Sequence, residues 1–176
     1  MIRRGRLVLA LLCLIGPGSS AAMTVEQAYR AIPHERTVFD VGAATMEAEE
    51  RTFLERFFDL IDQAIVARVE RMQALPSRGA PSDRYDELLQ HFGAMPVPVR
   101  LRHVHQLVID AVKEQRASLD EWRRSGATSD IRRHPRVQRA SQKLHAAYGE
   151  LMQLFPREGA HNQQAFYDYL CALDFI

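Results

Sequence analysis

The sequence predicts an all-α fold, an antiparallel helical bundle with an extended N-terminal strap. The 176-residue chain is 47% hydrophobic and carries a formal charge of +1, which is typical of an ordered globular domain. Apolar residues recur at steps of three and four along three long segments, which is the period of amphipathic helices. Short stretches with proline and glycine separate the segments, and matched helices joined by short loops pack antiparallel.

The first 22 residues have the three-part layout of a cleaved secretory signal peptide. Three arginines lie within the first six residues, followed by an apolar run at 7–16 and a small-residue stretch at 17–22. We expect cleavage between Ala22 and Met23, where small residues fit the peptidase. Ten apolar residues rise only ~15 Å as a helix, against a hydrocarbon core of ~30 Å. The sequence therefore predicts export to the periplasm or the exterior, with no membrane span in the mature chain.

A short helix and an extended strap are expected at 23–45, ahead of the bundle. Thr24 and Gln27 fit a capping box, in which each side chain satisfies a free backbone N–H, so a helix should run from Val25 to Ala31. Residues 32–45 lack a helical period and contain β-branched residues and glycine, which favours an extended strap. Phe39 is its expected anchor in the core.

Residues 46–176 are expected to form the bundle, in a single domain with the strap. The apolar stripes predict three long helices and two shorter ones, at 46–75, 99–124 and 135–155, and at 82–92 and 162–174. Thr45 is the expected N-cap of the first long helix. Gly93 is expected to end the helix at 82–92, and Pro135 suits the first turn of the third long helix.

The charge and cysteine content of the chain limit the classes of partner that it can bind. Without the leader, 20 basic and 22 acidic residues remain, a net charge of −2. The mature chain is therefore not a general polyanion binder, and no nucleic acid is expected as a partner. Basic residues gather at 98–145, which indicates either complementary helix faces or a partner-binding surface. Cys171 is the single cysteine left, and we expect a buried thiol or an intermolecular disulfide.

Seven histidines raise the question of a metal or haem site. Covalent haem is excluded because its C-x-x-C-H motif is absent around Cys171, so any cofactor remains unspecified. His103 and His105 face opposite sides of a helix and could chelate one ion only in an extended segment. Asp130 and His134 form an acid–histidine pair four residues apart. These four residues are the candidate metal ligands.

Arg68 falls near the middle of the apolar stripe of its helix, where an uncompensated charge is costly. It can extend to solvent, pair with a buried acid such as Asp40 of the strap, or face a small anionic ligand. The strap is also dense in polar side chains, with His34 and Arg36 near Asp40. These four residues are the candidate ligand site, and the alternative is that the strap merely covers the edge of the core.

No catalytic motif supports an enzyme: the sequence has neither G-x-S-x-G nor a glycine-rich phosphate loop. The leading hypothesis is an exported, non-catalytic bundle that binds a protein partner or a small ligand, with its oligomeric state left open. The alternative is a metal- or haem-dependent redox or metal-handling protein that uses histidine and methionine side chains. A hydrolytic enzyme built around the strap and Arg68 is a third possibility.

Overall fold

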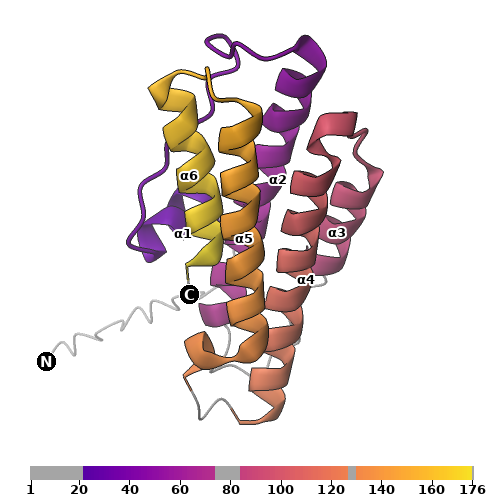
Figure 1. Ribbon diagram of the computed structural model, residues 1–176. Helices are drawn as coiled ribbons and strands as arrows, with labels where there is room; N and C mark the ends of the chain where they lie inside the picture. Colours follow the sequence, from indigo (N-terminus) through magenta and orange to yellow (C-terminus); the bar gives the residue numbers. More distant parts are fainter. Residues whose placement is uncertain (1–21, 74–83, 127–129, 176) are drawn as a thin grey trace, which may run out of the picture.

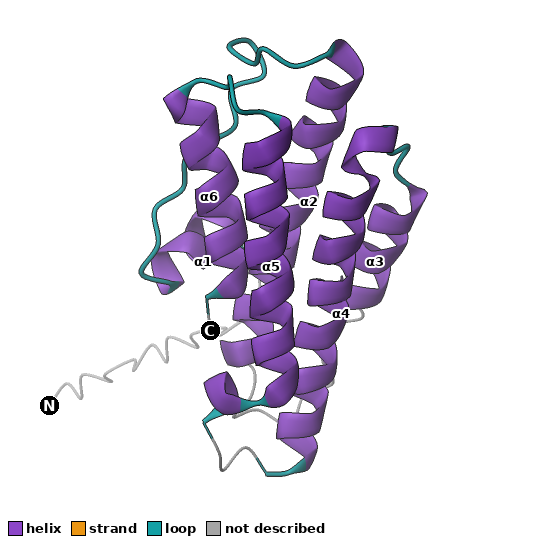
Figure 2. Cartoon of the chain, viewed as in Figure 1, coloured by secondary structure: helices purple, strands orange, loops and turns teal. Residues whose placement is uncertain are grey.

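The computed structural model describes residues 22–73, 84–126 and 130–175, and these form an antiparallel bundle of α-helices, confirming the predicted fold class (Figure 1). The described residues are otherwise loops and short 3₁₀ turns, without strands (Figure 2). The helices are α1 (Val25–Ala31), α2 (Ala48–Gln73), α3 (Arg84–Ala94), α4 (Arg102–Arg124), α5 (Pro135–Leu154) and α6 (Ala160–Asp174). None of these helices is long and apolar enough to cross a membrane.

The helices from α2 onward alternate in direction, and α5 packs between α4 and α6 (Figure 1). α2 packs against α1, α3 and α6, and α3 also contacts α4. α2 and α6 run in the same direction because three helices of alternating direction, α3, α4 and α5, lie between them in the chain. The strap, residues 32–45, runs along α6 before α2 begins (Figure 1). The strap therefore lies on the outer side of the α2–α6 pair.

Aromatic side chains form the centre of one continuous core. Phe57, Phe58, Phe92 and Phe166 are each at most 1% exposed, and burial of such a side chain contributes roughly 1.5–3 kcal/mol. The ring of Phe39 lies 5.4 Å from that of Phe58 and 6.0 Å from that of Phe166, which confirms it as the anchor of the strap. These contacts join the strap to α2 and α6.

Two helix starts follow the sequence signals. At α1 the capping box is complete, because Gln27 N donates to Thr24 Oγ1 at 3.2 Å and Thr24 N donates to Gln27 Oε1 at 2.9 Å. α5 begins at Pro135, as predicted, and His134 Nδ1 accepts from Arg136 N at 3.3 Å. The missing N–H of Pro135 costs nothing at a position that has no intrahelical acceptor.

The expected N-cap of α2 was wrong. Thr45 instead bonds to the segment before α6, donating from N and Oγ1 to Glu158 Oε1 at 2.7 and 2.6 Å. α2 begins three residues later, at Ala48, and Glu50 Oε2 accepts from Glu47 N at 3.3 Å near its first turn. A tertiary bond has therefore displaced the local cap.

Other helix ends differ by a few residues. Gly93 does not end its helix, because α3 continues to Ala94. The segment predicted at 99–124 begins as a 3₁₀ turn at Val99–Leu101. Its predicted end at Arg124 is confirmed, and Gly126 follows with a φ of 83°, which favours glycine.

The last helix begins at Ala160, two residues before its predicted start. The predicted end at Leu75 and the predicted start at Ser82 lie outside the described residues, as do residues 1–21 of the expected leader.

Candidate functional site

The strap is fixed to the bundle by buried polar side chains. Asp168 Oδ2 accepts from Thr37 N at 3.1 Å. Asn162 Oδ1 accepts from Asp40 N at 2.9 Å, and Asn162 Nδ2 donates to Asp40 O at 3.1 Å. We call the bonds between the strap and four buried residues the strap seam, and those residues are Asp62, Glu158, Asn162 and Asp168.

Arg36, one of the predicted ligand-site residues, belongs to this seam. Its Nη2 pairs with Asp62 Oδ2, and Tyr29 Oη donates to Asp62 Oδ1 at 3.0 Å. The guanidinium also lies 5.7 Å from the centre of the Tyr29 ring. Burial raises the pKa of Asp62 above its usual range, although the bonds from Arg36 and Tyr29 oppose that rise. The charge of Arg36 is thus used within the fold.

His34 lies beside the same seam but is less firmly held. Its Nε2 is 3.6 Å from Asp168 Oδ1, and this buried nitrogen has no hydrogen-bond partner among the described residues. Its ring centre lies 6.2 Å from that of Tyr167, which is 43% exposed. The structure therefore places His34 and Arg36 along one strap but on different carboxylates.

Asp40 does not pair with Arg68, so that alternative for Arg68 does not hold. Asp40 Oδ1 accepts from Gly42 N at 2.9 Å and from Ala43 N at 3.1 Å, which fixes a tight turn in the strap. Its backbone is held by Asn162. Asp40 therefore shapes the strap instead of neutralising a buried cation.

Arg68 does not extend to solvent and has no carboxylate partner among the described residues; it caps the end of α6. It is 4% exposed, and it donates to Leu173 O and, at 3.4 Å, to Asp174 O. Gln115 Nε2 donates to the same Leu173 carbonyl at 2.8 Å. Burial lowers the pKa of Arg68 to about 10, so the side chain stays charged at neutral pH, where a cation suits the negative end of a helix. The four predicted ligand-site residues therefore do not meet in one place.

The structure gives each predicted metal ligand a different partner. The contacts are His103 Nδ1 with Glu150 Oε2, His105 Nε2 with Phe92 O, Asp130 Oδ1 with Arg132 N, and His134 Nε2 with Glu121 Oε2. Among the described residues, no three His, Cys, Asp or Glu side chains are grouped to hold an ion. The predicted set thus forms separate structural contacts.

The contact of His105 has a structural role at the end of α3. Its Nε2 lies 3.0 Å from Phe92 O, near the C-terminal end of α3, and rings of Phe53, Phe57 and Phe92 surround it. Burial lowers its pKa, which favours the neutral imidazole that donates to this carbonyl. His105 therefore caps α3 as Arg68 caps α6, because exposed helix carbonyls need donors.

Cys171 is half-buried on α6, and burial raises the pKa of its thiol. Its side chain borders an open groove of about 610 Å³ between α5 and α6, where Ser141 Oγ donates to Asp174 Oδ2 at 2.7 Å. A raised pKa keeps the thiol protonated at neutral pH, which makes it a poor nucleophile.

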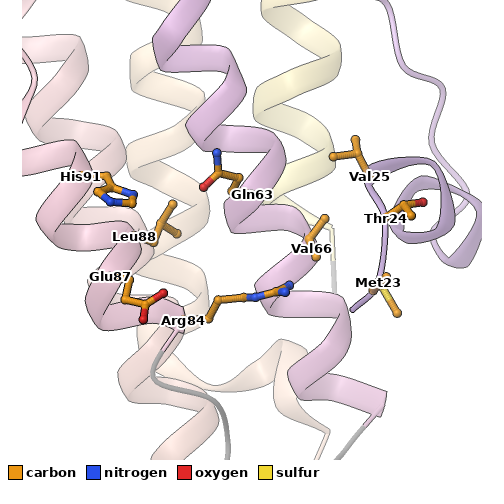
Figure 3. Close-up of a pocket in the computed structure, with 9 residues that line it drawn as sticks. All are labelled: Met23, Thr24, Val25, Gln63, Val66, Arg84, Glu87, Leu88 and His91. Carbon is orange, nitrogen blue, oxygen red and sulfur yellow. The ribbon is translucent and has the colours of Figure 1, made fainter. Parts of the chain in front are cut away.

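A second groove lies where the start of α1, the middle of α2 and the face of α3 meet (Figure 3). Its volume is about 370 Å³. We call it the N-terminal groove, and its lining residues are Met23, Thr24, Val25, Gln63, Val66, Arg84, Glu87, Leu88 and His91.

The N-terminal groove has an apolar floor and a polar rim. Val66 and Leu88 are 4% and 3% exposed and form the floor. The rim consists of the exposed side chains of Gln63, Glu87 and His91. These side chains make no hydrogen bond or ion pair within the described ranges. Small-molecule sites typically combine an apolar surface with a few polar groups that fix orientation.

Glu70 on α2 holds one edge of the groove together. Its Oε2 accepts from Arg84 Nη1 of α3 at 2.8 Å, and its Oε1 accepts from Met23 N at 3.0 Å. The Arg84 side chain extends from α3 toward α2 and the segment at Met23 (Figure 3). One carboxylate thus connects three segments that are distant in the sequence.

Sequence reasoning missed this groove. Arg84, Glu87 and His91 are three and four residues apart and share one face of α3, which is a signal available from the sequence. Their opposite wall, at Met23 and Gln63, comes from segments whose proximity no local pattern reveals.

Comparison with known proteins adds no assignment: no family model, no curated protein and no solved structure matches this chain. The functional conclusion therefore depends on the geometry of the groove and the strap.

Proposed function

We propose that this chain is an exported, non-catalytic binding protein that holds a small ligand in the N-terminal groove. The observation that carries the proposal is the concave surface of about 370 Å³ over Val66 and Leu88. This volume falls within the range of roughly 300–1,000 Å³ that small-molecule sites occupy. The strap offers less, because Arg36 is already paired with buried Asp62, and the backbone N–H groups of Thr37 and Asp40 bond to buried side chains of α6.

The lining indicates the chemistry of the ligand. The floor suits an apolar body, whereas the Gln63 amide, the Glu87 carboxylate and the His91 imidazole at the rim can donate and accept hydrogen bonds. Arg84 is paired with Glu70, and Glu87 adds a negative charge, so a simple anion gains little here. The groove favours a small amphipathic molecule with both donor and acceptor groups.

The export part of the proposal is supported by the leader pattern at residues 1–22. Intact-mass measurement of the chain recovered from its native compartment tests it. We expect a chain that begins at Met23, and a chain that retains the leader would contradict export with cleavage.

A fragment screen followed by NMR chemical shifts tests the binding part. Ligands should shift the resonances of Val66 and Leu88, and Gln63→Trp should weaken binding at least about tenfold by filling the groove from an exposed position. The matched control is Glu55→Trp, two turns earlier on the exposed surface of α2 and outside the groove. Unchanged affinity in Gln63→Trp, or shifts confined to the groove beside Cys171, would contradict the assignment.

A further inference from the structure

The backbone nitrogen of Met23 is held by a carboxylate. Met23 N lies 3.0 Å from Glu70 Oε1, and the other oxygen of Glu70 accepts from Arg84 Nη1 at 2.8 Å. The Glu70 side chain is 26% exposed, so solvent only partly surrounds it. Met23 itself is partly buried and packs against the core. The start of the described fold is therefore fixed at an acidic side chain.

Met23 is also the residue that would follow the expected cleavage. Hydrolysis of the Ala22–Met23 peptide bond consumes one water, leaves a carboxylate on Ala22 and converts the amide N–H of Met23 into an α-amino group. The pKa of such a group is usually about 7.7–8.0, so most molecules carry an ammonium at neutral pH. A hydrogen bond from an ammonium to a carboxylate is shorter and stronger than one from an amide.

We propose that Glu70 is the docking site of the α-ammonium group that cleavage after Ala22 creates, and that this ion pair completes the rim of the N-terminal groove. The inference rests on the export part of the proposed function. It assigns a role to Glu70, which no sequence motif indicates, and makes processing a chemical step that strengthens one edge of the groove.

The surroundings fix where this ammonium stands. Thr24 is the N-cap of α1, so Met23 lies directly before the cap, where its N is bonded to Glu70. A positive charge before a helix N-terminus is unfavourable by itself, because the helix dipole is positive there. Glu26 in the first turn of α1 and Glu70 on α2 compensate for that charge.

Three groups of α3 also face the groove and affect the ammonium. Arg84 shares Glu70 and opposes protonation, Glu87 favours it, and His91 is a further titratable group at the rim. Because Glu70 is the carboxylate in direct contact with Met23 N, we expect its effect to outweigh the others. The expected rise in the α-amino pKa is modest, roughly half a unit, since the pair is partly exposed.

The test uses the chain 23–176, which contains every described helix and the strap. A fusion that is cleaved to leave Met23 as the first residue supplies the free amine, and NMR titration gives its pKa. We expect an α-amino pKa above about 7.7–8.0. This rise in pKa should be absent in Glu70→Gln. It should persist in the control Glu87→Gln, which removes a charge from the same groove.

Nα-acetylation provides a second readout, because it restores an amide at the same nitrogen. A raised folded-state pKa stabilises the fold below the unfolded value and loses that effect as pH rises through the folded value. The free-amine chain should therefore have a higher Tm than the acetylated chain at about pH 7, and the difference should vanish at about pH 10. Glu70→Gln should abolish the Tm difference at about pH 7.

The outcomes separate this inference from the export proposal. If the α-amino pKa is the same in the unchanged chain and in Glu70→Gln, the docking site is overturned, even when the native chain begins at Met23. A native chain that begins elsewhere would overturn both, because the ammonium of Met23 would never form. Detection of the native start at Met23, together with the Glu70-dependent pKa, would support both.

Discussion

The strap seam and the N-terminal groove are both rich in polar side chains, yet they use them differently. In the seam, Asn162 and Asp168 are 2% and 3% exposed and bond to the backbone of the strap. In the groove, the side chains of Glu87 and His91 are exposed above an apolar floor. They make no hydrogen bond or ion pair with the rest of the described chain. The four buried residues of the seam are bonded within the fold, whereas the groove leaves its rim side chains available.

This difference has a simple physical cause. A buried polar group without a partner costs about 1–3 kcal/mol, so the fold pairs such groups internally. An exposed group is solvated and can exchange water for a ligand at little cost. Polar density in a sequence therefore indicates a binding site only when the side chains remain accessible and unpaired in the folded chain, and Arg36 of the strap is already paired with Asp62.

The largest expected effect is on the seam. Asn162→Ala removes bonds to Asp40 N, Asp40 O and Glu158, leaving the Asp40 backbone groups without these partners. We expect a loss of about 2–3 kcal/mol in the free energy of unfolding, measured by urea denaturation. The control Gln163→Ala removes an amide from the next residue and should change little. Equal losses in the two variants would refute the structural role of the seam.

A double-mutant cycle sharpens the comparison at Asp62. We expect Asp62→Asn and Arg36→Gln to show a coupling of about 1–2 kcal/mol in unfolding free energy, because a charge-assisted bond joins the two side chains. The Arg36 side chain is 28% exposed, which limits the magnitude. Additive effects, agreeing within about 0.5 kcal/mol, would show that the pair contributes no specific interaction.

A pH-dependent effect is expected at the buried cap of α3. Burial lowers the pKa of His105 in the folded state, so its contribution is present above the unfolded value of about 6.5 and is lost as pH falls through the folded value. Urea denaturation between about pH 8 and about pH 5 should show a smaller stability loss in His105→Phe than in the unchanged chain. If the unfolding free energy falls equally with pH in His105→Phe and in the unchanged chain, this histidine is not a source of acid sensitivity.

The smallest effect is expected at the groove. Glu87→Ala and His91→Ala should change the unfolding free energy by no more than about 0.5 kcal/mol, because both side chains are exposed and unbonded within the described residues. They should still alter the affinity of a ligand that shifts Val66 and Leu88 resonances. A stability loss above about 1 kcal/mol would mean that the rim is structural, like the seam.

Local patterns anticipated much of the fold but little of the candidate site. The capping box at Thr24, the proline start of α5 and the anchoring role of Phe39 followed from residue chemistry alone. Thr45 failed as a cap because Glu158, 113 residues away, binds its N–H and hydroxyl. Arg36, Arg68 and His105 do not gather in one site for a similar reason, since each bonds to a group on another element of the fold.

The sequence by itself determined the all-α class, the positions of the helices and the extended strap, because helical periodicity and capping depend on residues a few positions apart. Only the tertiary structure decided that Arg68 and His105 cap helix ends, and that Glu70, Arg84 and Met23 meet at one edge of a groove. Those contacts depend on how α1, α2, α3, α4 and α6 pack. No local pattern encodes which distant side chain satisfies a buried carbonyl.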